Sequence, residues 1–295
     1  MKLEISRGNL RGTVDTHGGE LISFLAAADG AGATEYIWNG DPKFWTGRNP
    51  ILFPIVGNLK NQTVEIDGTA YHMNRHGFAR NMEFAVADQG DDFVSLELRE
   101  NAETLACYPF RFSLRVCHRI LEHGFATSFH IENTDERPMP FCIGAHTAFR
   151  CPLHEGEQFS DYRVVFAEPE QADSILLTPD GLISADGRLP FLNGTDCFTP
   201  DYDLFGRLDT IIFDGLKSTS MSLLHDQTKH GVRMDFEGFP MVAFWTKPGA
   251  PYLCLEPWHG CAAAENESGQ FEKKPHCMIL APKEAKDLTY TVTIL

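Results

Sequence analysis

The sequence predicts an all-β protein in which mostly antiparallel strands form a sandwich or barrel with few and short helices. Apolar and polar residues alternate with a period of two in several short segments, and sustained helical periodicity is absent. The clearest alternating segments are residues 94–98, 110–116, 125–131, 232–236 and 288–294. Turn-forming residues separate such segments, at Ala28-Asp29-Gly30 and at residues 66–68, 179–181 and 247–249.

Residues 102–107 predict one short helix of a turn or two, which Pro109 would end. The chain has 295 residues, of which 43% are hydrophobic and 22% charged, a composition typical of a globular protein with a large core. Its length allows two domains, but no linker, composition shift or short repeat divides it. We therefore expect a single domain over residues 1–295.

The charge balance argues against whole classes of partner. There are 25 Lys and Arg against 41 Asp and Glu, a formal net charge of −16, whereas nucleic acids and anionic membrane surfaces attract basic proteins. The first residues lack the apolar segment of a secretory signal, and the most apolar run, residues 50–56, is too short to span a bilayer. The expected compartment is the cytoplasm, where the eight cysteines would stay reduced.

Two segments carry basic residues among Gly, Pro and aromatic residues. In residues 45–57, Arg48 is either a surface residue before a buried strand or a guanidinium aimed into a pocket. In residues 71–80, His72 and His76 have the spacing of a helical metal pair, but Gly77 follows at once and no H-E-x-x-H frame exists. A metal site is therefore disfavoured, and a hydrogen-bonded loop histidine is the default interpretation.

Two further segments suggest general acid–base chemistry. His146 follows an apolar strand and two small residues, Gly144 and Ala145, which would let a ligand approach closely. Glu256 stands in an apolar run before Pro257 and Trp258, so its carboxyl is either structurally paired or tuned for proton transfer. Together a His and a Glu in apolar surroundings suit proton exchange, and the neighbouring tryptophan can pack against a sugar ring.

Taken in order, these segments resemble the aldose 1-epimerase (galactose mutarotase-like) superfamily, and most of all its bacterial LacX-like branch. The most specific motifs are residues 47–54, 76–80, 144–146 and 256–258, and the resemblance covers nearly the whole chain. It implies a β-supersandwich of large, mostly antiparallel sheets. It also implies interconversion of the α and β anomers of a free hexose through the ring-opened aldehyde, with no metal or redox cofactor. The implied partner is a small-molecule sugar.

The resemblance also assigns roles to individual residues. His146 matches the histidine that protonates the ring oxygen, and Glu256 matches the glutamate that takes the anomeric hydroxyl proton. His76 matches a second histidine that orients the sugar, and Arg48 matches an arginine that binds its hydroxyls. Asp209 matches a substrate-binding aspartate less closely.

Arg80 and Trp258 complete the substrate-binding candidates. The sequence leaves open whether the substrate is a free sugar or a sugar phosphate. Residues 76–80 also resemble the hexose-6-phosphate epimerase branch, in which arginines hold the phosphate; Arg48, Arg75 and Arg80 would form such a cluster. A neutral aldose ranks first, because a net charge of −16 gives an anionic substrate no long-range attraction.

Three other questions stay open at this point. A non-catalytic sugar binder or sensor could use the same scaffold, and a glycosidase acting through two carboxylates is a weaker alternative, since only Glu256 has an apolar setting. The protein is expected to be a monomer or a homodimer. Residues 186–203 are polar and rich in turn formers, which suits a mobile loop over the site.

Overall fold

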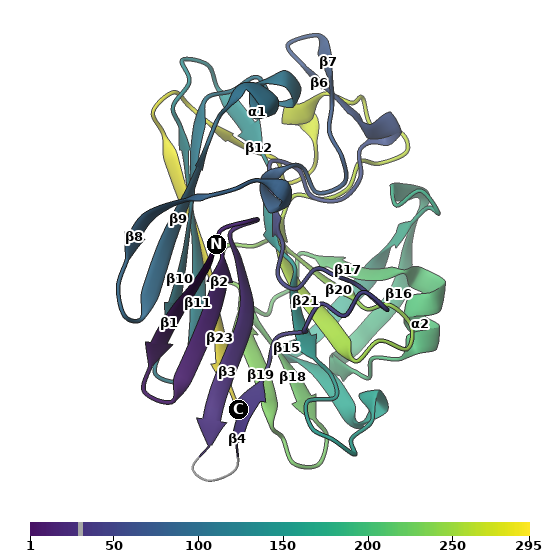
Figure 1. The fold of residues 1–295 in the computed structure, drawn as a ribbon. Coiled ribbons are helices and arrows are strands. Elements are labelled where there is room, and N and C mark those ends of the chain that lie inside the picture. The colour runs from purple at the N-terminus through teal and green to yellow at the C-terminus, as the bar shows by residue number, and fades with distance from the viewer. Residues whose placement is uncertain (29–31) are drawn as a thin grey trace.

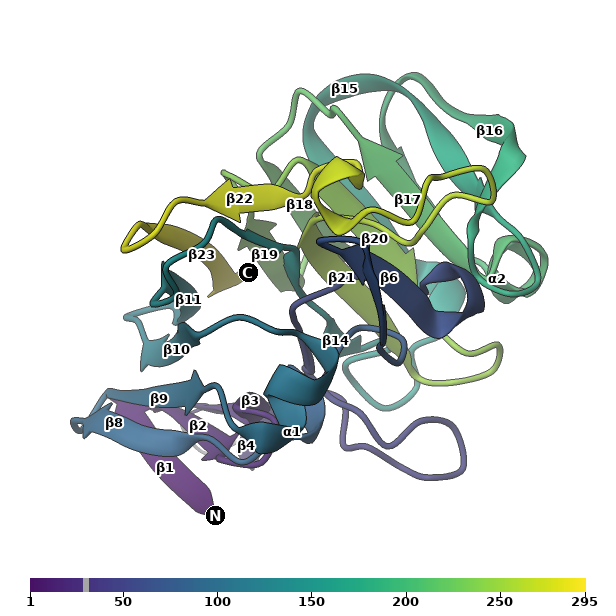
Figure 2. The ribbon, with the colours of Figure 1, turned by 90° about the horizontal axis from the view of Figure 1, so that it is seen from above.

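The computed structural model describes residues 1–28 and 32–295, and in these the all-β prediction is confirmed. Asp29 and Gly30 of the turn expected at Ala28-Asp29-Gly30 lie outside the described residues. The other expected turns connect β6 to β7, β15 to β16 and β20 to β21. Figures 1 and 2 show strands throughout the molecule, with helices confined to short connections.

The largest sheet has nine strands, and all of its neighbouring pairs are antiparallel. In spatial order its strands are β16 (Ile183–Phe198), β15 (Tyr162–Leu177), β18 (Ser220–His225), β19 (Gly231–Asp235), β23 (Ala285–Ile294), β11 (Gly124–Asn133), β10 (Phe112–Ile120), β9 (Phe93–Arg99) and β8 (Ala85–Gln89). The five segments predicted from alternation lie in this sheet except at their ends, where residues 110–111 precede β10 and residue 236 follows β19.

A six-stranded sheet carries the residues of the predicted site. Its strands are β17 (Thr210–Asp214), β20 (Met241–Trp245), β21 (Tyr252–His259), β13 (Ile143–Ala145) and β5 (Ile51–Leu52), with β14 (Thr147–Arg150) also paired to β21. A four-stranded sheet, visible in front of β9–β11 in Figure 1, consists of β1 (Lys2–Arg7), β2 (Leu10–Asp15), β3 (Glu20–Ala28) and β4 (Gly32–Glu35). Two short pairs complete the strands: β6 (Thr63–Ile66) with β7 (Thr69–His72), and β12 (Met139–Phe141) with β22 (Met278–Leu280).

Burial follows the alternation that the sequence shows. Phe125, Phe129 and Ile131 of β11 are buried, and β10 places Ile120, Val116 and Leu114 directly opposite them. Each fully buried side chain of this size contributes about 1.5–3 kcal/mol of transfer free energy. This stripe of cross-strand pairs is part of a core that includes residues of the four-stranded, six-stranded and nine-stranded sheets.

The helix prediction is confirmed, and the loop prediction is not. Helix α1 spans Ala102–Cys107, and the Asn101 side chain caps it by accepting from the Glu103 and Thr104 N–H groups. Residues 186–203, expected as a mobile loop, instead belong mostly to β16 and to the start of helix α2 (Tyr202–Leu208). Repeated register shifts between β15 and β16 break the period-two pattern, which is why the strand is hard to see in the sequence. No described helix is long and apolar enough to cross a membrane.

Candidate active site

A cavity of about 240 Å³ opens beside the six-stranded sheet, and most of the predicted site residues meet there. Its lining includes the predicted residues His146, Glu256, His76, Arg80, Asp209 and Trp258. Arg75, Trp45 and Trp245 also line it, as do Leu177 at the end of β15 and Gly181 in the turn between β15 and β16. Asp180 in that turn is anchored across the chain, since its carbonyl accepts from Asn58 Nδ2 at 2.7 Å.

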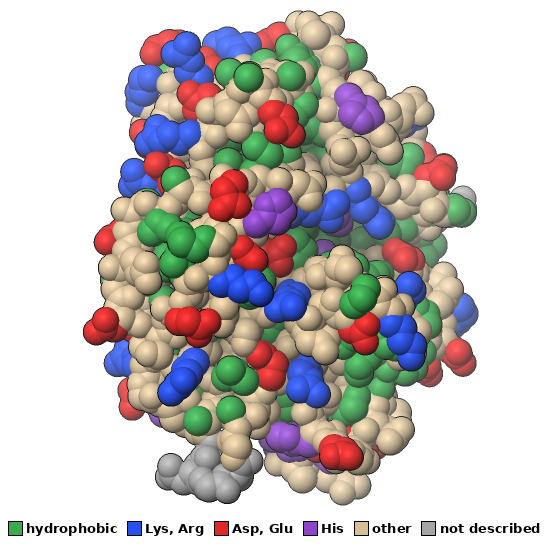
Figure 3. Space-filling model, viewed as in Figure 1, with side chains coloured by type: hydrophobic (Ala, Val, Ile, Leu, Met, Phe, Trp, Pro, Cys, Tyr) green, Lys and Arg blue, Asp and Glu red, His purple; other side chains and the backbone are tan. Residues whose placement is uncertain are grey.

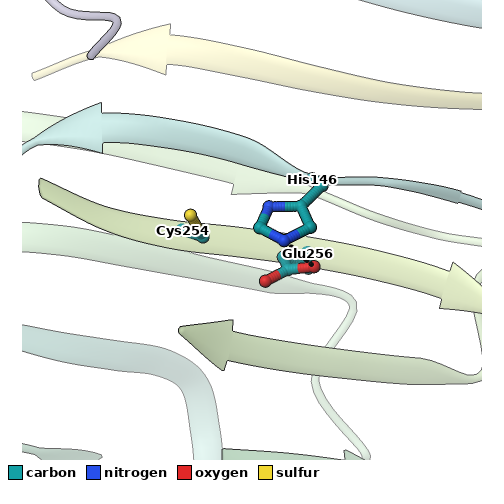
Figure 4. A group of neighbouring side chains, drawn as sticks. All are labelled: His146, Cys254 and Glu256. Carbon is teal, nitrogen blue, oxygen red and sulfur yellow. Dashed lines mark ion pairs between the residues drawn. The ribbon is translucent and has the colours of Figure 1, made fainter. Parts of the chain in front are cut away.

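The register of β21 brings His146 and Glu256 together. β13 pairs Gly144 with Trp258, and β14 pairs Thr147 with Leu255, so the same register continues across the gap between the two strands. His146 lies in that gap, and the register therefore places it directly opposite Glu256 of β21. Its Nε2 lies 3.4 Å from Glu256 Oε2, and both residues are buried (Figure 4).

Gly144 serves packing of the site, a role that differs from the close ligand approach inferred from the sequence. A Cβ atom at this position would lie 2.6 Å from Cδ1 of Trp258. The absence of a side chain at Gly144 therefore leaves room for the indole ring of Trp258, which β21 places opposite it. A larger residue at position 144 would therefore displace Trp258, which lines the cavity.

His76 is held as a neutral hydrogen-bond donor toward the cavity. It has a positive φ of 66°, followed by Gly77 at 73°, where a Cβ would lie 2.2 Å from the Phe53 carbonyl oxygen. The Gly57 N–H donates to its Nδ1 at 3.0 Å, so the ring hydrogen sits on Nε2. Burial lowers the pKa of His76 well below its usual value, with His146 and Arg80 adding to the effect. The ring meets that of His146 edge-on, with centroids 5.8 Å apart.

Of the three arginines in the predicted cluster, two line the cavity and the third contacts the backbone of another strand. Arg75 and Arg80 line the cavity, and Arg80 Nη2 donates to the Arg75 carbonyl at 2.9 Å. The structure does not bring Arg48 there: its Nη1 donates to the Ile22 carbonyl at 3.1 Å, beside β3. Arg48 thus makes a scaffold contact here, and its expected contact with sugar hydroxyls stays a prediction. Figure 3 shows that basic side chains gather across the middle of one face despite the acidic composition.

Burial shifts both members of the histidine–glutamate pair toward their uncharged forms. Desolvation raises the pKa of Glu256 well above its usual value, although Trp258 and Arg75 oppose the shift. Desolvation, together with the positive charges of Arg80 and Arg75, lowers the pKa of His146 to about 3. Desolvation therefore favours the neutral imidazole and the protonated carboxyl, a form in which the pair holds one transferable proton.

Several buried polar atoms at the cavity have no hydrogen-bond partner among the described residues. They are His146 Nδ1, Glu256 Oε2, Trp258 Nε1 and Arg80 Nε. Buried polar groups are nearly always paired, and a cluster of exceptions marks a place where a polar ligand binds. Aromatic rings complete the wall, since the Trp45 and Trp245 centroids lie 4.9 and 5.7 Å from that of His146.

Cys254 is the residue of this site that the sequence did not single out. It lies two positions before Glu256 on β21, so both side chains point to the same face (Figure 4). Possible donor atoms of His146, Cys254 and Glu256 lie within 4.8 Å of one another, a set that could hold a metal ion. Burial raises the pKa of the Cys254 thiol well above its usual value, so the free thiol stays protonated.

The fold is that of the galactose mutarotase-like class, as the sequence motifs predicted. The chain belongs to the aldose 1-epimerase family, whose model matches residues 1–276. It is 36% identical to the chromosomal LacX protein of Lactococcus lactis subsp. lactis, with all of both chains covered. A plasmid-borne LacX protein of the same subspecies matches equally.

Solved structures agree with this placement. A galactose mutarotase-like protein from Lactobacillus casei is 26% identical, with a TM-score of 0.92 and full coverage of both chains. A galactose mutarotase related enzyme from Lactobacillus acidophilus is 29% identical, with a TM-score of 0.91 over 100% of this chain and 97% of that chain.

The depressed pKa of His146 makes the stability of the fold depend on pH. Because the folded pKa is about 3 and the unfolded value about 6.5, the stabilisation is present above pH 6.5 and is lost as the pH falls toward 3. Going from pH 7 to pH 5 should cost about 2 kcal/mol through this residue, while the raised pKa of Glu256 acts in the opposite direction over the same interval. Urea denaturation at both pH values measures the change in the free energy of unfolding, which should be less destabilising by a corresponding amount in His146→Gln. An equal pH dependence in both proteins would contradict the assignment.

Proposed function

We propose that the protein is an aldose 1-epimerase that interconverts the anomers of a free aldohexose by general acid–base catalysis. The observation that carries the proposal is the buried His146–Glu256 pair, 3.4 Å apart at the cavity wall. The ring oxygen O5 and the anomeric oxygen O1 are bonded to the same carbon. Two groups this close can therefore contact both oxygens of one sugar.

Proton transfer at this pair balances without any external acid or base. With a sugar bound, the one shared proton first passes from Glu256 to His146. The imidazolium then gives it to O5 while the Glu256 carboxylate accepts the proton of the O1 hydroxyl. The C1–O5 bond breaks, and O1 becomes the aldehyde oxygen. The pair is then neutral imidazole and carboxylic acid, the uncharged form that burial favours. Rotation about C1–C2 and the reverse transfers close the ring as the other anomer.

The remaining lining residues suit the binding of a polyol. The His76 Nε2–H, the Arg75 and Arg80 guanidiniums and the Asp209 carboxylate provide donors and an acceptor for hydroxyl groups. Trp45 packs against His146 and holds the imidazole in place, while Trp258 offers an aromatic face to a sugar ring. Positioned proton transfer contributes about 10²–10⁴-fold per group, which is substantial for a reaction that water already performs slowly.

A sugar phosphate is the second candidate substrate. Arg75 and Arg80 line the same cavity and lie close enough to lower the pKa of His76, so a phosphate there would find two cations. The neutral aldose stays first, because the acidic chain gives no long-range attraction to an anion.

Replacing either member of the pair should remove the catalysed reaction. We expect His146→Ala and Glu256→Gln to lower the rate of mutarotation by about 10²–10⁴-fold each, because each removes one proton transfer. Polarimetry on freshly dissolved α-D-glucose and α-D-galactose measures this rate. Matched controls are His123→Ala and Glu122→Gln, whose side chains are exposed and are not among the residues that line the cavity. Wild-type rates in either site variant would overturn the proposed roles.

The same assay with glucose 6-phosphate distinguishes the substrate classes. Acceleration of free hexose relaxation is the expected result, and it should persist at reduced efficiency in Arg80→Met, which keeps an unbranched, largely apolar stem but removes the charged guanidinium. Acceleration of the phosphate alone would replace the neutral aldose by the sugar phosphate. Sugar binding without any acceleration would make the protein a binder or sensor on this scaffold.

Removal of metal ions tests the donor set of His146, Cys254 and Glu256. Since the histidine–glutamate pair supplies both proton transfers, we expect dialysis against a chelator to leave the rate unchanged. Loss of activity that Zn²⁺ restores in the wild type would show that a metal ion takes part in the reaction.

A further inference from the structure

A second cluster of ionisable side chains lies outside the cavity, where two connections meet at the end of the nine-stranded sheet. The turn after β14 provides His154 and Glu157, and the turn between β18 and β19 provides His230. We call these three residues the His154 cluster. One possible donor atom from each lies within 4.8 Å of the other two. Figure 3 shows histidine atoms beside acidic atoms at the surface of the lower end of the molecule, where β18 and β19 lie.

The geometry of the cluster is that of a set of converging metal ligands. His230 Nε2 lies 3.1 Å from Glu157 Oε1, and the His154 and His230 ring centroids are 4.7 Å apart. Ligands of a tetrahedral ion with bonds of about 2.0–2.1 Å are roughly 3.4 Å apart. The His230–Glu157 separation already meets this requirement. The His154 side chain is exposed and can rotate to close the remaining gap.

Hydrogen bonds from neighbouring groups fix the orientation of the His230 and Glu157 side chains. Thr228 Oγ1 lies 2.7 Å from His230 Nδ1, which leaves Nε2 directed at Glu157 and at the Tyr162 hydroxyl, 3.1 Å away. Glu157 Oε2 accepts from the Tyr162 hydroxyl and, at 3.1 Å, from the His154 N–H, which leaves Oε1 directed at His230. Such hydrogen bonds to the far sides of the ligands are typical of built metal sites.

We propose that the His154 cluster binds a divalent transition-metal ion of the zinc type, with His154, Glu157 and His230 as ligands and water in the fourth position. Two imidazoles and one carboxylate are ligands that Zn²⁺ accepts in tetrahedral geometry. The bound ion connects the turn after β14 to the β18–β19 hairpin. Because only the folded chain brings these segments together, the ion stabilises the native state.

Calorimetric titration of chelator-stripped protein with ZnCl₂ tests the proposal directly. We expect one Zn²⁺ per chain at this site, a melting temperature that rises with Zn²⁺ concentration, and a visible absorption spectrum when Co²⁺ replaces zinc. Glu157→Gln and His230→Gln should weaken binding by at least tenfold and abolish the rise in melting temperature. His154→Ala should do the same, and because its side chain is exposed, this variant keeps the test valid if the other two fail to fold.

Two controls separate this site from other sources of metal binding. His17→Gln removes an exposed histidine that also lies beside a glutamate, at 3.8 Å from Glu83, and should bind zinc like the wild type. His146→Gln disables the donor set at the cavity and should keep the site. Binding lost in His146→Gln but kept in the cluster variants would assign the ion to the cavity and overturn the proposal. So would the absence of zinc binding in the wild type, or equal binding in all variants.

Discussion

The pairing of β21 on both of its edges is the constraint on which the site depends. β20 places Ala243 beside Glu256 on one edge, and β13 with β14 brackets His146 on the other. The glutamate therefore sits on a central strand whose backbone is held by hydrogen bonds on both sides. A slip of one residue would turn Glu256 to the opposite face of the sheet and separate it from His146.

A buried polar network connects this pairing to the larger sheet. Thr147, the residue after His146, donates to Asn49 Oδ1 at 2.8 Å, and its Oγ1 lies 3.2 Å from the Tyr290 hydroxyl of β23. Asn49 Nδ2 also donates to that hydroxyl at 3.3 Å. Because a partly satisfied network in a dry core is costly, these contacts favour one relative position of the two sheets. The segment that contains Arg48 thus supports the site through Asn49 as well as through Trp45 and Gly57, which line the cavity.

The sequence predicts the parts of this structure that keep a regular period. Segments of the nine-stranded sheet alternate because one face packs on the core and the other is more exposed, as in β11. The strands around the site do not alternate: β13 has three buried residues in succession, and β5 has only two residues. Such strands give no periodic signal, so the placement of His146 beside Glu256 came from the family resemblance. The direction of the Arg48 side chain depends on the Ile22 carbonyl of another strand, which no local pattern reveals.

The two histidine–glutamate contacts show how surroundings decide the chemistry of the same pair of side chains. Desolvation dominates at Glu256 and raises its pKa, which favours the protonated carboxyl. At Glu157 burial is partial, and although it raises the pKa, hydrogen bonds from Tyr162 and the His154 N–H lower the net value below the usual range. The first pair stands in the middle of a sheet, and the second at strand ends reached by solvent. A central strand therefore provides a proton-transfer pair, whereas the edge of the same fold provides an anionic ligand beside imidazoles.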